Sequence, residues 1–365
     1  MSTRPERNAA IDHIRVLLTI LVILHHAAIV YGGSGSWYWK DELIKPSRLL
    51  LLFNAVNQSY FMGFFFLLAG YFTPRSFDRK GASSYLADRF LRLGLPLLVY
   101  FFAVSPFTIA LSRTSGGHPL WPGWADMIRA RVFEPGPLWF AEALLLAALA
   151  YAAWRALSKR PSSAFARLPS NRAMLVAAIA IGAVSFLVRL VVPVGVNVLW
   201  LQLAYFPPYV LLFITGCLAA PHQLLERVTF AEARPWTITS AVMFVLLPVV
   251  ILTNGDAGSF LGGWSFKAAF YAWWDPFIAW GIILTMLWFF RTRCASGSRF
   301  TFALGRQAFG AFIVHPPVLV GLSLLARTWT LPPLLKFGFV GATACVGSFA
   351  VAGLLLLIPG LRKIL

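Results

Sequence analysis

Ten apolar stretches, each about as long as a bilayer is thick, constrain this chain more than any other feature of its sequence. A helix needs about 20 mostly apolar residues to cross the ~30 Å hydrocarbon core of a membrane. The stretches cover residues 14–31, 49–72, 93–111, 138–157, 174–194, 199–220, 236–252, 273–290, 309–325 and 335–357. Charged residues make up only 12% of the 365 positions, too few to give a soluble domain its polar surface. The sequence predicts an all-α polytopic membrane protein with about ten transmembrane helices in the lipid bilayer.

Basic residues are divided unevenly between the two sets of loops. If the N-terminus is placed on one side, that side collects 21 Lys and Arg residues and the other side nine. Cytoplasmic loops of membrane proteins carry such an excess, so we predict that both termini are cytoplasmic. The expected location is the plasma (cytoplasmic) membrane, with several passes. The same rule accounts for the net charge of +18, and we expect no nucleic-acid partner.

A single membrane-embedded domain is expected over residues 1–365, with helices 1–5 and 6–10 joined by short loops. The segment 159–170 (KRPSSAFARLPS), between the fourth and fifth stretches, is the best linker. The first apolar run contains two histidines and no obvious A-x-A cleavage site, so we expect it to remain as a helix. The three cysteines are far apart and form no CxxC motif. Neither a metal nor a permanently bound cofactor is therefore expected.

The first apolar stretch carries an arginine and two histidines. Ionisable side chains inside a bilayer cost ~2.5–3.5 kcal/mol or more each and usually face a cavity or a partner. Arg15 and His26 are eleven residues apart, almost three helical turns, so they share a face and lie about 16 Å apart along the axis. His25 points about 100° away. A neutral imidazole can take a proton from a hydroxyl, so His26 is a candidate general base; alternatively, it only hydrogen-bonds a neighbouring helix.

Two guanidinium groups stand at the predicted cytoplasmic start of the third helix. Arg89 and Arg92 are three positions apart and therefore share one helix face. Guanidinium groups bind planar oxyanions bidentately, so this pair suits a ligand that carries phosphate. The alternative is that both residues are ordinary basic flanks of a membrane span.

Two carboxylates lie at or inside predicted helix ends. Glu142 lies about one turn inside the fourth helix, where it can orient a histidine, bind a sugar hydroxyl or serve as a structural acid. Asp275 precedes Pro276 at the predicted outer end of the eighth helix, where proline favours helix entry or a kink. Arg189 lies inside the fifth span and is expected to pair with an acid or to extend towards the membrane surface.

His315 precedes two prolines in the ninth apolar stretch. Two prolines leave backbone carbonyls without their helical partners, so the sequence predicts that the helix breaks here and lines a cavity. Two roles remain open for the imidazole: it is functional, or it supports the broken backbone.

Five segments, in order along the chain, resemble the acyltransferase-3 family of integral membrane acyltransferases. They are IDHIR at 11–15 followed after ten residues by His26, FFFLLAGYF at 64–72, RFLR with LGLP at 89–96, PLWF at 137–140 and FGAFIVHPP at 309–317. The first 100 residues look most like the glucan-biosynthesis branch, which succinylates periplasmic glucans. The chain departs from the family where Ala69 replaces a serine and where Phe309 and Phe312 replace tyrosines, so no role of those hydroxyls carries over.

The resemblance implies an acyl-CoA-dependent acyltransferase that transfers groups other than aminoacyl groups. Acyl-CoA would be the cytoplasmic co-substrate, and a polysaccharide or glucan hydroxyl on the outer side would accept an acetyl or succinyl group. His26 would be the catalytic base, and Glu142 would orient His26 or the acceptor. The CoA phosphates would lie near Arg15, Arg89 and Arg92. As supporting residues we expect Asp12, His315 and Asp275.

Other function classes remain open at this level. Ten spans with a broken helix and intramembrane His and Glu residues also describe a secondary transporter of a small polar or acyl-bearing solute. A structural membrane subunit is a third reading, although it leaves the shared face of Arg15 and His26 unexplained. The sequence decides neither the acyl group nor the acceptor. Direct transfer and an acyl-enzyme relay remain alternatives, and a homo-oligomer is compatible with the sequence.

Overall fold

The computed structural model describes residues 8–158, 164–254 and 258–364, and within these residues the regular structure is helical. The α-helices are α1 (Ala9–Val30), α2 (Arg48–Lys80), α3 (Ala82–Arg89), α4 (Leu95–Val99), α5 (Ser105–Arg113), α6 (Leu120–Arg129), α7 (Trp139–Ser158), α8 (Asn171–Val191), α9 (Phe206–Ala219), α10 (Phe230–Asn254), α11 (Phe266–Arg293), α12 (Arg299–Leu325) and α13 (Pro333–Leu355). Part of the expected linker 159–170, and Arg4 and Arg7 of the charge count, lie outside the described residues.

Nine of the described helices are long and apolar enough to cross a membrane, which confirms the all-α polytopic class. The sixth predicted span differs from its expected form. It starts at Leu203 rather than Leu199 and reaches only Ala219, which is about 25 Å at 1.5 Å per residue. Leu199 and Trp200 have positive φ angles, and such backbone cannot continue a helix. The apolar run therefore begins as a turn, and the helix starts only afterwards.

The third span is one helical rod, from Ala82 to Gly116, that contains two π-helical turns. These turns, η1 (Phe90–Gly94) and η2 (Tyr100–Val104), lie just before Pro96 and Pro106. Proline has no backbone N–H and its ring crowds the carbonyl four residues earlier. The wider turns accommodate both prolines without ending the helix. Arg92 lies in the first π turn.

The helix that carries His315 is not broken, so that prediction is wrong. α12 runs from Arg299 to Leu325 through Pro316 and Pro317. Pro316 cannot donate to the carbonyl of Phe312, which an ordinary residue would bond in a helix. Instead, Nδ1 of the His315 ring lies 2.6 Å from that carbonyl oxygen. A side-chain hydrogen bond thus replaces the missing backbone bond.

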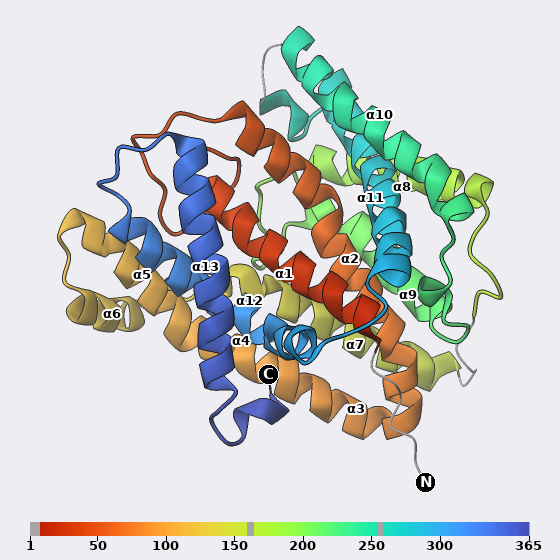
Figure 1. Cartoon of the computed structure of the whole chain (residues 1–365), viewed down its shortest axis with the longest axis horizontal. Helices are drawn as coiled ribbons and strands as arrows, with labels where there is room; N and C mark the ends of the chain where they lie inside the picture. The colour runs from red at the N-terminus through yellow and green to blue at the C-terminus, as the bar shows by residue number, and fades with distance from the viewer. Residues whose placement is uncertain (1–7, 159–163, 255–257, 365) are drawn as a thin grey trace.

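α1 lies at the centre of the helix arrangement, where it contacts α2, α11, α12 and α13 (Figure 1). On one side α11 packs against α8 and α10, and on the other α12 packs against α13 and α5. The outer faces carry large exposed apolar side chains, such as Val176 on α8 and Val346 on α13. A lipid-facing surface has this character. The buried polar side chains of α1 therefore face other helices and not the bilayer.

Candidate active site

Two imidazole rings from opposite ends of the sequence meet where α1 packs on α12. Nδ1 of His26 lies 3.1 Å from Nε2 of His315, and the rings stack with centroids 5.0 Å apart. His315 is fully buried, whereas His26 keeps partial exposure. His26 is therefore the more exposed member of the pair. The structure brings together two of the predicted site residues; the ring of His315 supports the backbone at Phe312, and a functional role for it stays a prediction.

The hydrogen bonds of the pair define which nitrogen atoms carry hydrogen. A carbonyl oxygen can only accept, so Nδ1 of His315, 2.6 Å from the Phe312 oxygen, is the donor. In a neutral ring the other nitrogen is then an acceptor, and Nε2 of His315 accepts from Nδ1–H of His26. This assignment follows from the hydrogen-bond network. With its hydrogen on Nδ1, a neutral His26 ring carries its lone pair on Nε2, which is the state that a general base needs.

A tryptophan that the sequence analysis did not single out covers the pair. The Trp37 ring stacks on His26 with centroids 4.0 Å apart, and it lies 5.7 Å from the ring of His315. It belongs to the connection between α1 and α2, residues 31–47, which we call the Trp37 loop. Its position in a run of aromatic residues, SWYW at 36–39, resembles an ordinary membrane-surface belt. No sequence pattern therefore distinguished it.

Two buried asparagines of α2 hold the neighbouring part of α1. Nδ2 of Asn54 donates to the carbonyl of His25 at 3.0 Å, and Nδ2 of Asn57 donates to the carbonyl of Leu21 at 3.1 Å. His25 stacks on Phe61 with centroids 5.0 Å apart. The two asparagines are three residues apart in an apolar helix, and that spacing could have revealed them in the sequence as one polar face.

Glu142 lies in the first turn of α7 and is half-buried. Among the described residues it makes no hydrogen bond or ion pair with either imidazole, and Nδ1 of His26 is bonded to His315 instead. Its neighbour Phe140 packs against Phe312 of α12 at 6.0 Å between centroids. The first turn of α7 thus lies one residue layer from the imidazole pair, and a role of Glu142 towards the acceptor stays a prediction.

Asp275 belongs to a separate buried ion pair with Arg189. Both side chains are almost fully buried, and Nη2 of Arg189 donates to a carboxylate oxygen of Asp275. The guanidinium also lies 5.0 Å from the ring centroid of Tyr271 and 5.4 Å from that of Tyr205. This confirms the expectation that Arg189 pairs with an acid. It also gives Asp275 a structural partner, on α8, rather than a contact with the imidazole pair.

The predicted donor-binding arginines lie towards the other end of α1 and around α3. Because α2 packs on α1 and follows it after a loop, the end of α2 returns to the level at which α1 begins. Arg15 pairs with Asp12 at 3.3 Å, and Arg92 pairs with Asp88 at 3.1 Å. The Arg89 guanidinium lies 5.2 Å from the ring centroid of Tyr85. We call this region, where α1 begins and α2 ends, the basic end.

Arg155 joins the basic end, although the sequence analysis used it only in the charge count. It pairs with Asp78 at 2.7 Å, and its guanidinium lies 5.0 Å from the ring centroid of Phe77. The rings of Phe77 and Tyr85 are in turn 5.5 Å apart. Arg155 and Arg89 are thus connected through two aromatic rings, and each guanidinium group makes a cation–π contact with one of them.

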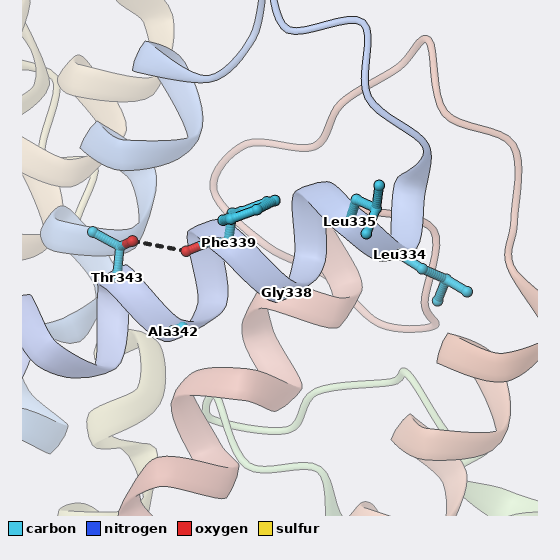
Figure 2. Close-up of a pocket in the computed structure, with 6 residues that line it drawn as sticks. All are labelled: Leu334, Leu335, Gly338, Phe339, Ala342 and Thr343. Carbon is cyan, nitrogen blue, oxygen red and sulfur yellow. Dashed lines mark hydrogen bonds between the residues drawn. The ribbon is translucent and has the colours of Figure 1, made fainter.

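A surface pocket of about 390 Å³ on α13 contains none of these residues (Figure 2). Its lining is made by one helix only, by Leu334, Leu335, Gly338, Phe339, Ala342 and Thr343. The hydroxyl of Thr343 donates to the carbonyl of Phe339 at 2.8 Å. The pocket therefore offers an apolar helix face and no reactive group. Across the described chain, no cluster of three or more His, Cys, Asp and Glu side chains could hold a metal ion.

Comparison with known proteins gives two kinds of match. Residues 8–353 match the acyltransferase-3 family, described as "Acyltransferase domain". Among curated proteins, Glucans biosynthesis protein C of Escherichia coli (strain SMS-3-5 / SECEC) is 32% identical over 119 residues, which are 32% of this chain and 30% of the relative. The same protein of Escherichia coli O1:K1 / APEC matches with the same identity and coverage. The matched region thus spans about a third of the length of these relatives.

No solved structure matches this chain. The family match, by contrast, includes every helix from α1 to α12 and nearly all of α13. Both histidines of the imidazole pair and the arginines of the basic end lie inside it. The chain is therefore a multi-pass membrane protein that belongs to the acyltransferase-3 family of acyltransferases.

Proposed function

We propose that this protein transfers an acyl group from cytoplasmic acyl-CoA to a hydroxyl of an extracytoplasmic glucan, across the plasma membrane. The observation that carries the proposal is the His26–His315 pair, with a nitrogen–nitrogen distance of 3.1 Å. The similarity to proteins named Glucans biosynthesis protein C supports a glucan as acceptor. The basic end supports a donor that carries phosphates, because guanidinium groups bind phosphate bidentately.

The proposed step is general-base transfer at Nε2 of His26. This nitrogen takes the proton of the acceptor hydroxyl, and the oxygen attacks the thioester carbonyl carbon of acyl-CoA. The carbon–sulfur bond breaks, the CoA thiolate leaves, and the imidazolium returns its proton to the sulfur. An oxygen ester forms, and one thiol is released. His315 holds the base in the tautomer that this step requires.

The distance between the two parts of the site fits the donor. Arg15 and His26 are eleven residues apart on α1, about 16 Å of helix rise. A pantetheine arm can span such a length, with the CoA phosphates near Arg15, Arg89 and Arg92 and the thioester near His26. Holding the donor and the acceptor together in this way contributes part of the rate enhancement.

The test is labelled acyl transfer by His26→Gln protein in membranes and after purification. We expect a loss of about 10²- to 10⁴-fold, the usual contribution of a general base. His118→Gln is the control, because His118 is an exposed histidine in the connection between α5 and α6, outside both the pair and the basic end. Its transfer rate should stay near that of the wild type. Near-normal transfer by His26→Gln would remove the proposal.

Two further measurements separate the alternatives. Isothermal titration of CoA into the purified protein should show binding that weakens when Arg89 and Arg92 are both replaced by Gln. A transporter would instead move a glucan or acyl-bearing solute across vesicles without acyl-CoA. A labelled acyl group that stays on the protein when the acceptor is removed would show that transfer runs through an acyl-enzyme relay and not directly.

A further inference from the structure

We propose that Trp37 is a positioning residue for the His26–His315 pair, and that the buried ion pair between Asp41 and Lys336 holds Trp37 in place. The inference rests on the proposed function, since that function gives the imidazole pair its reaction. It assigns a role to two elements otherwise unexplained: a polar loop packed on the site, and a lysine buried on a membrane helix.

The His26 ring is held in two directions. Within the ring plane, Nδ1 is fixed by the hydrogen bond to His315 at 3.1 Å. Against the ring face, the indole of Trp37 stacks at 4.0 Å between centroids and 25° between planes. Stacking restricts tilt of the imidazole but leaves its in-plane Nε2 lone pair uncovered. Trp37 therefore restricts the direction in which the base points without occupying the position of a hydroxyl.

Trp37 can do this only if its loop is rigid, and the loop is tied to α1 at several points. Backbone hydrogen bonds connect the two, among them Gly33 N to Ala28 O at 2.7 Å and Asp41 N to Val30 O at 3.1 Å, and within the loop Ser47 N bonds to Gly32 O at 2.9 Å. The last of these closes the loop beside Gly32, whose φ is +109°. Glycine tolerates this conformation where other residues are strained.

The ion pair ties the same loop to the start of α13. Nζ of Lys336 lies 2.7 Å from a carboxylate oxygen of Asp41, and the lysine also donates to the carbonyl of Arg327 at 3.4 Å. Asp41 and Lys336 are 6% and 4% exposed. A buried charge without its partner is strongly unfavourable. Loss of either side chain should therefore release the loop from α13 and not merely weaken a surface contact.

The indole N–H of Trp37 gives a second reason to expect this residue beside the reacting groups. Nε1 is buried and, among the described residues, has no hydrogen-bond partner. A buried donor that lacks a partner is costly unless a water or a ligand supplies one. Beside the imidazole pair, the fitting ligand atom is an oxygen of the acceptor, either the attacking hydroxyl or its neighbour on the sugar ring.

The first experiment measures kcat and the acceptor KM for Trp37→Ala, Trp37→Phe, Asp41→Asn and Lys336→Met. Misplacement by about 1 Å can cost about 100-fold in rate, so we expect kcat to fall about 10- to 100-fold in all but Trp37→Phe. Trp37→Phe keeps a stacking ring and loses the N–H, so its acceptor KM should rise more than its kcat falls. The exchange of charges in Asp41→Lys with Lys336→Asp should restore part of kcat. Glu42→Gln, an exposed neighbour, is the matched control.

The second experiment does not depend on the reaction. Diethylpyrocarbonate modifies the unprotonated imidazole, and mass spectrometry reads the modification of His26 in the full-length protein. We expect faster modification in Trp37→Ala, Asp41→Asn and Lys336→Met than in the wild type or in Glu42→Gln. Unchanged modification together with unchanged kcat per folded molecule would overturn the inference. If His26→Gln remains active while loop release still exposes His26, the proposed function fails and the account of the loop stands.

Discussion

At the scale of single residues, His315 illustrates how one side chain meets two needs. Pro316 removes the backbone donor for the carbonyl of Phe312, and the His315 ring supplies a donor in its place. That bond fixes the ring as an acceptor at Nε2, which is the atom that meets His26. The carboxylate of a serine-protease triad orients its histidine in a comparable way. The missing backbone hydrogen bond at Pro316 and the tautomer of His26, which lies on another helix, are thus coupled.

The first prediction concerns this coupling. His315→Phe keeps an aromatic ring but removes both hydrogen bonds, so Nδ1–H of His26 loses its acceptor and the base loses its orientation. We expect transfer to fall by at least about tenfold. The double variant with His26→Gln should show no further loss, because residues that act as a unit are not additive. Losses that simply multiply in the double variant would show that the two rings act independently.

The second prediction concerns Glu134, in the connection between α6 and α7. The side chain is half-buried, and burial raises the pKa of its carboxyl above its ordinary value of 4.5. The folded state therefore binds this proton more tightly than the unfolded state does. Stability is highest while the group is protonated and is lost as pH rises from the ordinary value through the raised pKa.

Glu134→Gln removes the loss of stability at higher pH, because an amide does not titrate. In thermal unfolding in detergent, the variant should unfold at a higher temperature than the wild type at about pH 7, and the difference should disappear towards about pH 4. Glu42→Gln, in an exposed position, should show little difference at either pH. A stabilisation of Glu134→Gln that is the same at both pH values would contradict the burial argument.

At the scale of elements, two glycines allow α2 and α9 to approach closely. A Cβ atom on Gly70 would lie 2.0 Å from the carbonyl oxygen of Phe213, and one on Gly216 would lie 2.1 Å from that of Leu67. Small residues at helix contacts have this effect in membranes, where close packing replaces the hydrophobic effect between helices. Gly70, part of the family-like segment at 64–72, therefore has a structural reason to be glycine.

The third prediction follows from this contact. In Gly70→Ala and Gly216→Ala the new methyl group meets rigid backbone, so the helices must separate. Overpacking of this kind costs about 1–3 kcal/mol, and thermal unfolding in detergent should occur at a lower temperature. Gly338→Ala on α13 is the control, because no atom lies within 4 Å of its Cβ position. Equal unfolding temperatures for all three variants would contradict the proposed close contact.

At the scale of the whole molecule, hydropathy located the helices because a membrane span needs a continuous apolar run. It failed at residues 199–202, where positive φ angles at Leu199 and Trp200 interrupt an equally apolar run. The prediction from the two prolines failed at Pro316, because the proline pattern does not show that a neighbouring ring replaces the lost donor. The sequence singled out His26 and His315 separately, but not their contact across 289 positions. Helix packing decides that contact, and the same holds for Trp37 over His26.

The fourth prediction concerns how the molecule lies in the membrane. The excess of Lys and Arg on one set of loops predicts that the basic end faces the cytoplasm and that the Trp37 loop faces outwards. The proposed reaction needs this arrangement, because CoA is cytoplasmic and the glucan is not. The test starts from a variant without the three native cysteines. One new cysteine is introduced at a time, by Ser34→Cys in the Trp37 loop or by Ser296→Cys between α11 and α12. Both positions are exposed.

An impermeant maleimide applied to intact spheroplasts should label Cys introduced at position 34 and reach that at position 296 only after the membrane is permeabilised. Each cysteine variant should retain acyl transfer, which shows that the labelled molecules are folded. The opposite labelling pattern would place the Trp37 loop in the cytoplasm. The basic end would then face outwards, away from CoA, and both the charge rule and the proposed direction of transfer would be wrong for this chain.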